Sequence, residues 1–205
     1  MAAAPIRALI FDIGGVIVRS DAKRALGDLA DGSLHSPAEV AQLIRTDPRW
    51  QDWQEGRFAP REWHAHLSAR LGMTVSFARF CEIWNRAIDP APILSGEFFS
   101  GLSAHYKLAL LSNTDPIHVA HQEAKFSFFR FFPTRVYSCS VGLTKPHPGI
   151  YRRALDASGI LASESLYIDD VEAYVLSARQ VGMRAIVFSG PEQLKESLRA
   201  LDVKV

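Results

Sequence analysis

Carboxylates follow two apolar runs of the chain, and a pair of glycines stands beside one of them. Asp12 comes directly after the run Leu9-Ile-Phe, with Gly14-Gly15 close behind it, and Asp169-Asp170 ends the run Leu166-Tyr-Ile. Three carboxylates that lie close together repel one another unless a divalent cation offsets their charge, and Mg²⁺ prefers oxygen ligands. Asp12, Asp169 and Asp170 are therefore candidate ligands of a magnesium ion.

A hydroxyl, an amide and an ammonium group could bind an anion beside that metal. Ser112 and Asn113 stand at the start of a predicted helix, where N–H groups and the helix dipole favour negative charge. Lys145 precedes Pro146, which holds it extended at the entry to another helix. We expect Lys145 to neutralise both a carboxylate and a bound phosphate.

The histidines add one candidate. His64 and His66 are two residues apart on a predicted helix and would point to different sides of it, so they cannot chelate one ion. His118 and His121 share a helix face, where a surface role is expected. His118 lies one turn after Ser112-Asn113 and could reach the site.

Apolar runs alternate with helical stretches around these groups. Strands are predicted over 9–11, 107–112, 135–138, 166–169 and 184–188, and helices over 116–126, 148–158, 171–181 and 191–201. This alternation predicts an α/β fold, a doubly wound, Rossmann-like parallel sheet. Because parallel strands point the same way, Asp12, Ser112-Asn113 and Asp169-Asp170 are expected at one edge of the sheet, where open α/β folds bind ligands.

The strand pattern stops after Val18, and helices broken by turns are predicted instead. They begin at Pro37, run over 60–71 and run over 76–88, ahead of Pro90 and Pro92. We interpret residues 18–92 as a small helical domain. It is inserted into an α/β core that is formed by residues 1–17 and 93–205.

Aromatic residues cluster in two parts of the chain. All four tryptophans fall in the helical insertion, namely Trp50, Trp53, Trp63 and Trp84. We expect them to fill the core of a small bundle, with substrate stacking as the alternative. The Phe-rich stretch 126–132 is predicted to pack in the core. An exposed part of it would indicate a dimer contact, so a monomer or a homodimer is expected.

Composition excludes several classes of function. The chain has 205 residues, 48% of them hydrophobic, and a net charge of +1, which gives no electrostatic basis for binding nucleic acid or an anionic membrane. A small-molecule ligand is expected instead. Cys81 and Cys139 lack the spacing of a zinc site or a disulfide scaffold. Residues 1–7 show no signal-peptide pattern, and no apolar run reaches the roughly 18 residues that cross a bilayer, so we expect a cytoplasmic protein.

Four motifs occur in the order typical of one enzyme superfamily. They are Phe-Asp12-Ile-Gly-Gly-Val, Leu-Leu-Ser112-Asn-Thr, Gly-Leu-Thr-Lys145-Pro-His-Pro-Gly-Ile-Tyr and Tyr-Ile-Asp169-Asp170. With these motifs, which frame the whole chain, the sequence resembles the haloacid-dehalogenase-superfamily hydrolases, and among them the phosphatases. The resemblance implies a Mg²⁺-dependent hydrolase of small phosphate monoesters, sugar phosphates among them, with a helical cap over residues 18–92 that closes over the substrate.

The same resemblance implies a role for each matching residue. Asp12 would be the nucleophile that forms an aspartyl-phosphate intermediate, and Ser112 and Lys145 would hold the transferring phosphoryl group, with Asn113 beside them. The implied metal ligands are Asp12, the main-chain carbonyl of Gly14 and Asp170, with Asp169 nearby.

Two positions depart from the family's pattern. Phosphatases of this superfamily usually carry an aspartate two residues after the nucleophile, where it protonates the leaving oxygen and later activates water, but Gly14 stands there. The metal-binding carbonyl survives this change and the acid does not, so the proton donor is unassigned and His118 is a candidate for it. Tyr174 stands where many relatives have asparagine, which puts one further contact in doubt.

Three alternative functions remain open. Gly14 suits a 2-haloacid dehalogenase, whose halide leaving group needs no proton, although a metal-free enzyme has no need of the pair Asp169-Asp170. A phosphonate hydrolase would also tolerate the loss of the acid, but its chemistry resembles one that needs a lysine of the cap to form a Schiff base. The only lysine between residues 20 and 90 is Lys23, which lies close to the first strand. A binding protein that keeps the fold without catalysis is the third, and the joint retention of the motif residues argues against it.

Overall fold

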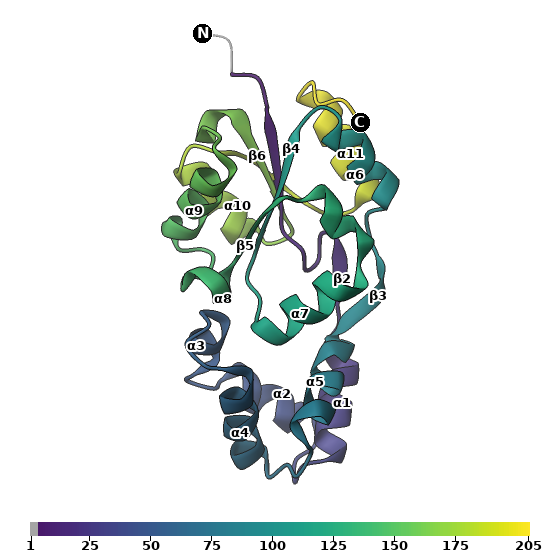
Figure 1. The fold of residues 1–205 in the computed structure, drawn as a ribbon, viewed down its shortest axis with the longest axis vertical. Coiled ribbons are helices and arrows are strands. Elements are labelled where there is room, and N and C mark those ends of the chain that lie inside the picture. The colour runs from purple at the N-terminus through teal and green to yellow at the C-terminus, as the bar shows by residue number, and fades with distance from the viewer. Residues whose placement is uncertain (1–3) are drawn as a thin grey trace.

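A parallel sheet forms one end of the molecule in the computed structural model, which describes residues 4–205 (Figure 1). Within these residues its strands are β1 (Ala8–Phe11), β4 (Lys107–Ser112), β5 (Thr134–Tyr137), β6 (Ser165–Asp169) and β7 (Arg184–Val187). They lie in the order β5-β4-β1-β6-β7, and every neighbouring pair is parallel. This confirms the predicted α/β fold class. Residues 1–3 of the segment predicted over 1–17 lie outside the described chain.

Helices cover both faces of this sheet. Because side chains alternate between the faces of a strand, Leu9 and Phe11 of β1 pack in one apolar cluster and Ile10 packs in another. The first face is covered by α6 (Gly96–Ser103) and α11 (Pro191–Ala200), and the second by α9 (Pro148–Ser158) and α10 (Glu172–Gln180). Burial on both faces explains why the strands are continuous apolar runs, and every predicted strand and helix from β4 onward matches its observed bounds to within one residue.

Two further helices follow the carboxyl ends of strands, namely α7 (Pro116–Lys125) after β4 and α8 (Ser138–Val141) after β5. The short 3₁₀ helices η2 (Ser127–Phe131) and η3 (Ala162–Glu164) precede β5 and β6. In the Phe-rich stretch, Phe126, Phe128, Phe129 and Phe132 are buried in the same cluster as Leu9. The prediction that this stretch packs in the core is therefore confirmed.

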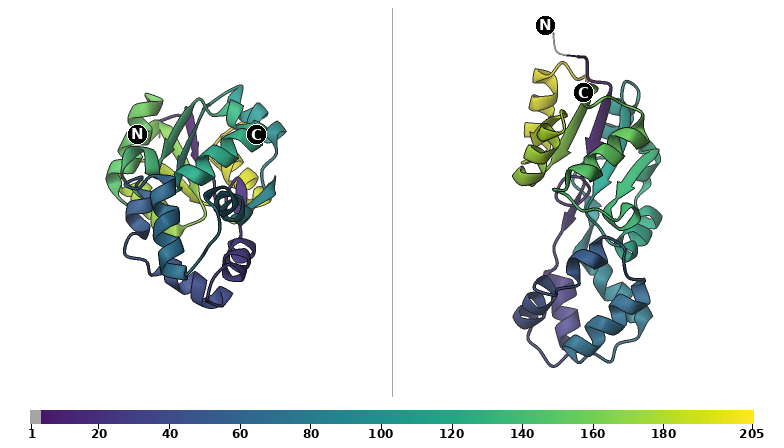
Figure 2. Two further views of the ribbon diagram at one scale, coloured as in Figure 1. Left: turned by 60° about the horizontal axis from the view of Figure 1, so that its bottom comes forward. Right: turned by 90° about the vertical axis from the view of Figure 1, so that its left-hand side faces the viewer.

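A bundle of helices forms the other end of the molecule (Figures 1 and 2). Its members are α1 (Lys23–Asp31), α2 (Pro37–Arg45), α3 (Trp50–Gln54), α4 (Pro60–Leu71) and α5 (Phe77–Trp84). Trp53 and Trp63 are fully buried in its apolar core, where their rings stack with centroids 5.4 Å apart. For these two tryptophans the core role is confirmed. Ile117 of α7 belongs to the same cluster, so the bundle packs directly against the α/β part.

A two-stranded ribbon connects the two parts, where the sequence predicted no strand. β2 (Val18–Ser20) pairs antiparallel with β3 (Ile88–Pro92), and the 3₁₀ helix η1 (Asn85–Ala87) precedes β3. The helix predicted over 76–88 therefore ends at Trp84, and the expectation that no strand follows Val18 is wrong. Proline is excluded from central strands but tolerated at edges, and both strands of this ribbon are edges, so Pro90 and Pro92 fit there.

Two predicted absences can be compared with the structure. Among residues 4–205, no helix combines the length and the apolar character that crossing a membrane requires. Cys81 and Cys139 are both free thiols in the described chain, as their spacing predicts.

Candidate active site

Asp12 and Asp169 lie next to each other because β1 and β6 are adjacent strands in register. Phe11 is paired with Ile168, and the N–H of Asp12 donates to the Ile168 carbonyl at 2.9 Å. Ser112 ends β4 on the other side of β1. The structure therefore brings these predicted residues to one edge of the sheet, as the strand pattern required.

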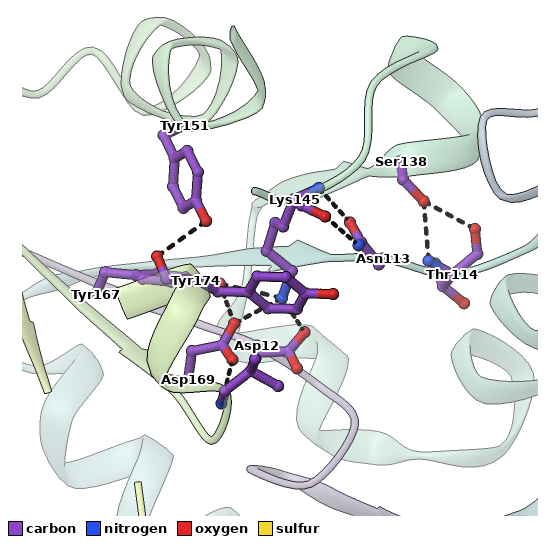
Figure 3. Close-up of polar contacts among 10 residues, drawn as sticks. Asp12, Asn113, Thr114, Ser138, Lys145, Tyr151, Tyr167, Asp169 and Tyr174 are labelled. Atoms are coloured by element: carbon purple, nitrogen blue, oxygen red, sulfur yellow. Dashed lines mark hydrogen bonds and ion pairs between the residues drawn. The ribbon is translucent and has the colours of Figure 1, made fainter. Parts of the chain in front are cut away.

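Lys145 bridges the two carboxylates from the loop before α9 (Figure 3). Its Nζ lies 2.9 Å from Oδ1 of Asp12 and 2.7 Å from Oδ2 of Asp169, and only 3% of the residue is exposed. Burial alone would lower the pKa of Lys145, but the charges of both carboxylates raise it above its usual value. The ammonium group is therefore held charged between two acids, although the residue is almost fully buried.

Asn113 fixes the main chain of Lys145. Its side-chain amide donates to the Lys145 carbonyl at 2.9 Å, and its side-chain oxygen accepts from the Lys145 N–H at 2.7 Å. Both ends of the amide are therefore used in positioning Lys145 (Figure 3). The Asn113 side chain, predicted to bind phosphate, donates only one of its two N–H groups to Lys145, so the second N–H is left for an oxygen of a ligand.

The protonation of Asp12 reflects its surroundings. Burial raises its pKa and Lys145 lowers it, while the charge of Asp169 raises it again, so that the pKa stands at about 6. Burial and the charge of Asp169 also raise the pKa of Asp170, which lies at the open side of the site. At neutral pH Asp12 is still ionised in its larger part, as a nucleophilic carboxylate must be.

The carboxylates offer a metal site. Asp12, Asp169 and Asp170 each present one oxygen, and these oxygens lie within 4.8 Å of one another. Asp169 is already committed, since Oδ2 accepts from Lys145 and from the Tyr167 hydroxyl and Oδ1 accepts from the Val171 N–H at 2.8 Å. Asp12 and Asp170 are thus the pair with oxygens to give to a cation.

Gly15 leaves the space into which the Asp170 carboxylate fits. A Cβ at this position would lie 2.1 Å from Oδ2 of Asp170, and the backbone φ of Gly15 is +78°, which favours glycine. The second glycine of the motif therefore lets the carboxylate approach the turn after Asp12. This close approach is what a cation held between Asp12, Asp170 and the turn requires.

Two tyrosines to which the sequence analysis assigned no role complete the site. Tyr167 lies two residues before Asp169 on β6, hence on the same face of the strand, and its hydroxyl is 3.1 Å from Lys145 Nζ. Tyr174, at the position that departs from the family pattern, places its ring centroid 4.9 Å from the same ammonium (Figure 3). The two-residue spacing between Tyr167 and Asp169 could have identified Tyr167 from the sequence. The position of the Tyr174 ring depends on how α10 packs, which the sequence does not show.

The surface role predicted for His118 is wrong. The side chain is 16% exposed, and Nδ1 lies 2.9 Å from Oδ2 of Asp115 while Nε2 lies 3.1 Å from the Trp84 carbonyl. Both partners are acceptors, so both ring nitrogens donate and the ring is an imidazolium. Burial alone would lower the pKa of His118, but Asp115 raises it above its usual value. With both N–H groups committed, His118 has no proton directed at a ligand.

His64 and His66 of α4 do not share a partner. His64 Nε2 lies 2.9 Å from the Val75 carbonyl, whereas His66 Nε2 lies 2.8 Å from Oδ2 of Asp47. The two rings therefore have separate partners, in agreement with the prediction that they do not chelate one ion.

Two adjoining cavities lie between the sheet edge and the bundle. The outer cavity, about 440 Å³, is lined by Asp12, Lys145, Asp170 and Tyr174. The inner cavity, about 290 Å³, extends from there into the bundle and is walled largely by apolar side chains. Both are lined by Gly14, Ser20, Trp50, Gln54, Ser112 and Asn113. A ligand with a charged end at Asp12 can therefore place its other end in the inner cavity.

Comparisons with known proteins agree with this geometry. Residues 6–182 match the model of a family described as haloacid dehalogenase-like hydrolases. Among curated proteins, D-ribitol-5-phosphate phosphatase of Bacteroides thetaiotaomicron is 24% identical over 183 residues, which cover 86% of this chain and 89% of that protein.

Solved structures share the fold. A haloacid dehalogenase family enzyme of Bacteroides thetaiotaomicron, in complex with magnesium and inorganic phosphate, is similar with a TM-score of 0.84 and 23% identity, over 95% of this chain and 100% of that one. The L-2-haloacid dehalogenase of Xanthobacter autotrophicus, with chloropropionic acid covalently bound, gives a TM-score of 0.64 and 19% identity, over 98% and 85%.

Proposed function

The chain belongs to the haloacid dehalogenase-like hydrolase family, and from that membership and its site we propose that it is a Mg²⁺-dependent phosphatase of small phosphate monoesters with Asp12 as nucleophile. The observation that carries the proposal is the cluster of Asp12, Asp169 and Asp170, whose oxygens lie within 4.8 Å of one another beside a buried lysine. A hydrolase that works without a metal has no need of such a cluster.

The residues present suit Mg²⁺. Asp12, Asp170 and the main-chain carbonyl of Gly14 would hold the ion, and Asp169 would hold Lys145 in place. When bound, Mg²⁺ neutralises charge on the phosphoryl group and on the attacking carboxylate. Its presence would also offset the repulsion between Asp12 and Asp170.

The reaction proceeds in two displacements. An oxygen of the Asp12 carboxylate forms a bond to phosphorus while the ester P–O bond breaks, and the leaving alkoxide takes a proton from water. Water then attacks the aspartyl-phosphate, which releases inorganic phosphate and restores Asp12. Ser112 and Lys145 would bind the phosphoryl oxygens through both steps, because charge on those oxygens is what a fixed ammonium stabilises.

The bundle would act as the cap of this site. Residues 18–92, the predicted inserted domain, include α3, whose Trp50 and Gln54 line both cavities. A substrate between bundle and sheet would be shielded from water, which strengthens the electrostatic interactions that hold the phosphoryl group. The curated relative named for D-ribitol 5-phosphate supports a small phosphorylated molecule as the substrate.

Dehalogenation is the second candidate, and Gly14 favours it. Halide leaves without a proton, and Gly14 has no acidic side chain to supply one to any leaving group. The fold of the solved L-2-haloacid dehalogenase is compatible with this chain. The two functions differ in their need for a metal, which an assay with a chelator separates.

The proposal is tested with the variant Asp12→Asn, because an amide cannot attack phosphorus while its shape is nearly that of the acid. We expect the wild type to hydrolyse p-nitrophenyl phosphate with Mg²⁺, to lose this activity in a chelator and to lose it in the variant. Phosphorylated protein should be detected by mass spectrometry after acid quenching of the wild type only. Asp156→Asn, the same change at an exposed position of α9, is the matched control.

Either of two results would contradict the proposal. One is substantial phosphatase activity of a folded Asp12→Asn protein. The other is turnover of 2-haloacids by the wild type in the chelator, with no reaction of any phosphate ester, which would establish the dehalogenase instead.

A further inference from the structure

The inner cavity differs in character from the outer one. Most of its wall surface is apolar and comes from side chains of both the sheet part and the bundle, among them Ile13, Ala25, Leu29, Ile44, Trp50 and Trp84. We propose that the leaving group of the substrate is an apolar body that occupies this cavity, an inference that rests on the proposed phosphatase function. Substrates such as alkyl or cycloalkyl phosphates would then be preferred to phosphates of polyols.

The polar groups that line the inner cavity alone are mostly committed to one another. Oδ1 of Asp115 accepts from the N–H groups of Ile117 and His118 at 2.9 and 3.0 Å. Oδ2 of Asp115 accepts from Trp84 Nε1 at 3.0 Å and from His118 Nδ1 at 2.9 Å. Since the second ring nitrogen of His118 donates to the Trp84 carbonyl, neither side chain has a free group for a ligand.

Ser20, Gln54, Ser112 and Asn113 keep polar groups for a ligand, but they also line the outer cavity and so lie where the two cavities meet. Among the described residues that line the inner cavity alone, two polar groups are not committed. Gln122 is 5% exposed, lies one helical turn after His118 on the same face of α7, and its buried Oε1 makes no hydrogen bond. The Thr114 hydroxyl is the other, because only the main chain of Thr114 is bonded, to Ser138. These two groups can accept one or two hydroxyls of a ligand, but a polyol chain brings several.

The scarcity of free polar groups in the inner cavity should affect the affinity for hydroxylated and for apolar ligands in opposite directions. A hydroxyl that is buried without a hydrogen-bond partner lowers affinity by roughly five- to 150-fold, whereas each buried methylene raises it by roughly fourfold. A volume of about 290 Å³ holds on the order of ten non-hydrogen atoms, judged by the roughly 30 Å³ that one water occupies in the liquid. The cavity thus fits a ring or a short branched chain.

A pair of ligands with one carbon ring tests the proposal on the wild type. Cyclohexyl phosphate and myo-inositol 1-phosphate differ in the ring hydroxyls alone. Their affinities are measured with Mg²⁺ by titration calorimetry, and as inhibition constants against p-nitrophenyl phosphate where that ester is hydrolysed. We expect cyclohexyl phosphate to bind at least about tenfold more tightly and with the more negative heat-capacity change. Equal affinities, or tighter binding of the inositol phosphate, would overturn the proposal.

A variant locates the binding. Ala25 of α1 is 4% exposed and lines the inner cavity, so Ala25→Leu fills part of it. We expect this variant to bind cyclohexyl phosphate about tenfold more weakly and to bind inorganic phosphate, which needs only the outer cavity, like the wild type. Ala38→Leu makes the same change at an exposed position of α2 and is the matched control.

The outcomes separate this inference from the proposed function. A phosphatase that prefers the inositol phosphate contradicts the apolar assignment alone. A protein that binds cyclohexyl phosphate more tightly yet hydrolyses no ester contradicts phosphatase activity alone. Unchanged binding of cyclohexyl phosphate by folded Ala25→Leu protein places the ligand outside the inner cavity and overturns the inference. If Ala25→Leu does not fold, the proposal is tested by the wild-type affinities for cyclohexyl phosphate and myo-inositol 1-phosphate.

Discussion

The site has room for an acidic side chain at residue 14, but this residue is glycine. A Cβ built there meets no atom within 4 Å, and Gly14 is not one of the glycines with positive φ. The position lines both cavities, between the nucleophile and the leaving group that we propose. The absence of a side chain at Gly14 is therefore no consequence of crowding or of backbone conformation, in contrast to Gly15.

Gly14→Asp should therefore fold and should supply a proton to the leaving oxygen. A positioned general acid contributes about 10²- to 10⁴-fold, and an activated ester such as p-nitrophenyl phosphate needs little protonation. We expect kcat/KM for an alkyl phosphate to rise within that range while the value for p-nitrophenyl phosphate changes little. Gly101→Asp, at an exposed position of α6 with nothing within 4 Å, controls for the added charge. An equal change on both esters would contradict the role of an acid at residue 14.

At the scale of elements, α7 links the sheet to the bundle through a charged pair. Asp115 is the N-cap residue of α7, with Pro116 at the first helical position, and Asp115 also binds His118 and the Trp84 indole from α5. His118 in turn donates to the Trp84 carbonyl. Trp84 is thus held at two points, so that the end of α5 is fixed to the beginning of α7.

This pair gives stability a pH dependence whose sign follows from the two pKa shifts. The pKa of His118 is raised by Asp115 against the effect of burial, so its contribution is full below about pH 6.5 and is lost as the pH rises through the folded-state pKa. Burial alone would raise the pKa of Asp115, but His118 and the hydrogen bonds lower it, so its contribution is lost as the pH falls through its folded-state pKa.

His118→Gln should remove the alkaline limb of this dependence. Melting temperatures are measured from pH 5 to 9 for wild type and variant. We expect the variant to be less stable by about 1.5–3 kcal/mol at pH 6, because a hydrogen bond to a charged group is lost, and the difference should shrink toward high pH. His105→Gln changes an exposed histidine and serves as control. A stability difference that is constant over this pH range would mean that His118 is not charged in the folded protein.

In the whole molecule, the bundle meets the α/β part at a second place, between α3 and α8. Gly56 follows α3 with φ +70°, and a Cβ on it would lie 1.9 Å from the Cys139 carbonyl oxygen. The Thr144 hydroxyl donates to Glu55 Oε1 beside it at 3.3 Å. With the Trp84 contact, this second contact holds the bundle over the two cavities at opposite ends.

Gly56→Ala should therefore open the molecule on the α3 side. The methyl group cannot be placed without moving the backbone, since the atom that it meets is a main-chain oxygen. We expect KM for phosphate esters to rise by roughly tenfold, and the tryptophan fluorescence, which comes entirely from the bundle, to change. Small-angle scattering should show a larger radius of gyration.

The matched control for this change is Gly159→Ala. Gly159 has a similar φ of +63° and nothing within 4 Å of its Cβ, so its substitution introduces the backbone strain alone. If both variants behave alike, the strain and not the contact with Cys139 is responsible, and the prediction is wrong.

Local sequence patterns determined the α/β part of this protein. Continuous apolar runs specify strands that are buried on both faces, and the rule that parallel strands end at one edge then places Asp12, Ser112 and Asp169 together. Four motifs were enough to indicate the family, because each sits at a strand end or a helix start. Even Tyr167 could have been found, since strand periodicity puts it on the face of Asp169.

Only the tertiary structure decided what surrounds those residues. The engagement of Asn113 with the Lys145 main chain, the position of Tyr174 over the ammonium, the charged state of His118 and the pairing of β2 with β3 all join segments far apart in the chain. The apolar inner cavity is made by side chains from both parts at once. Periodicity records which face of one segment is buried, but not which other segment buries it, and the chemistry of a cavity depends on that second choice.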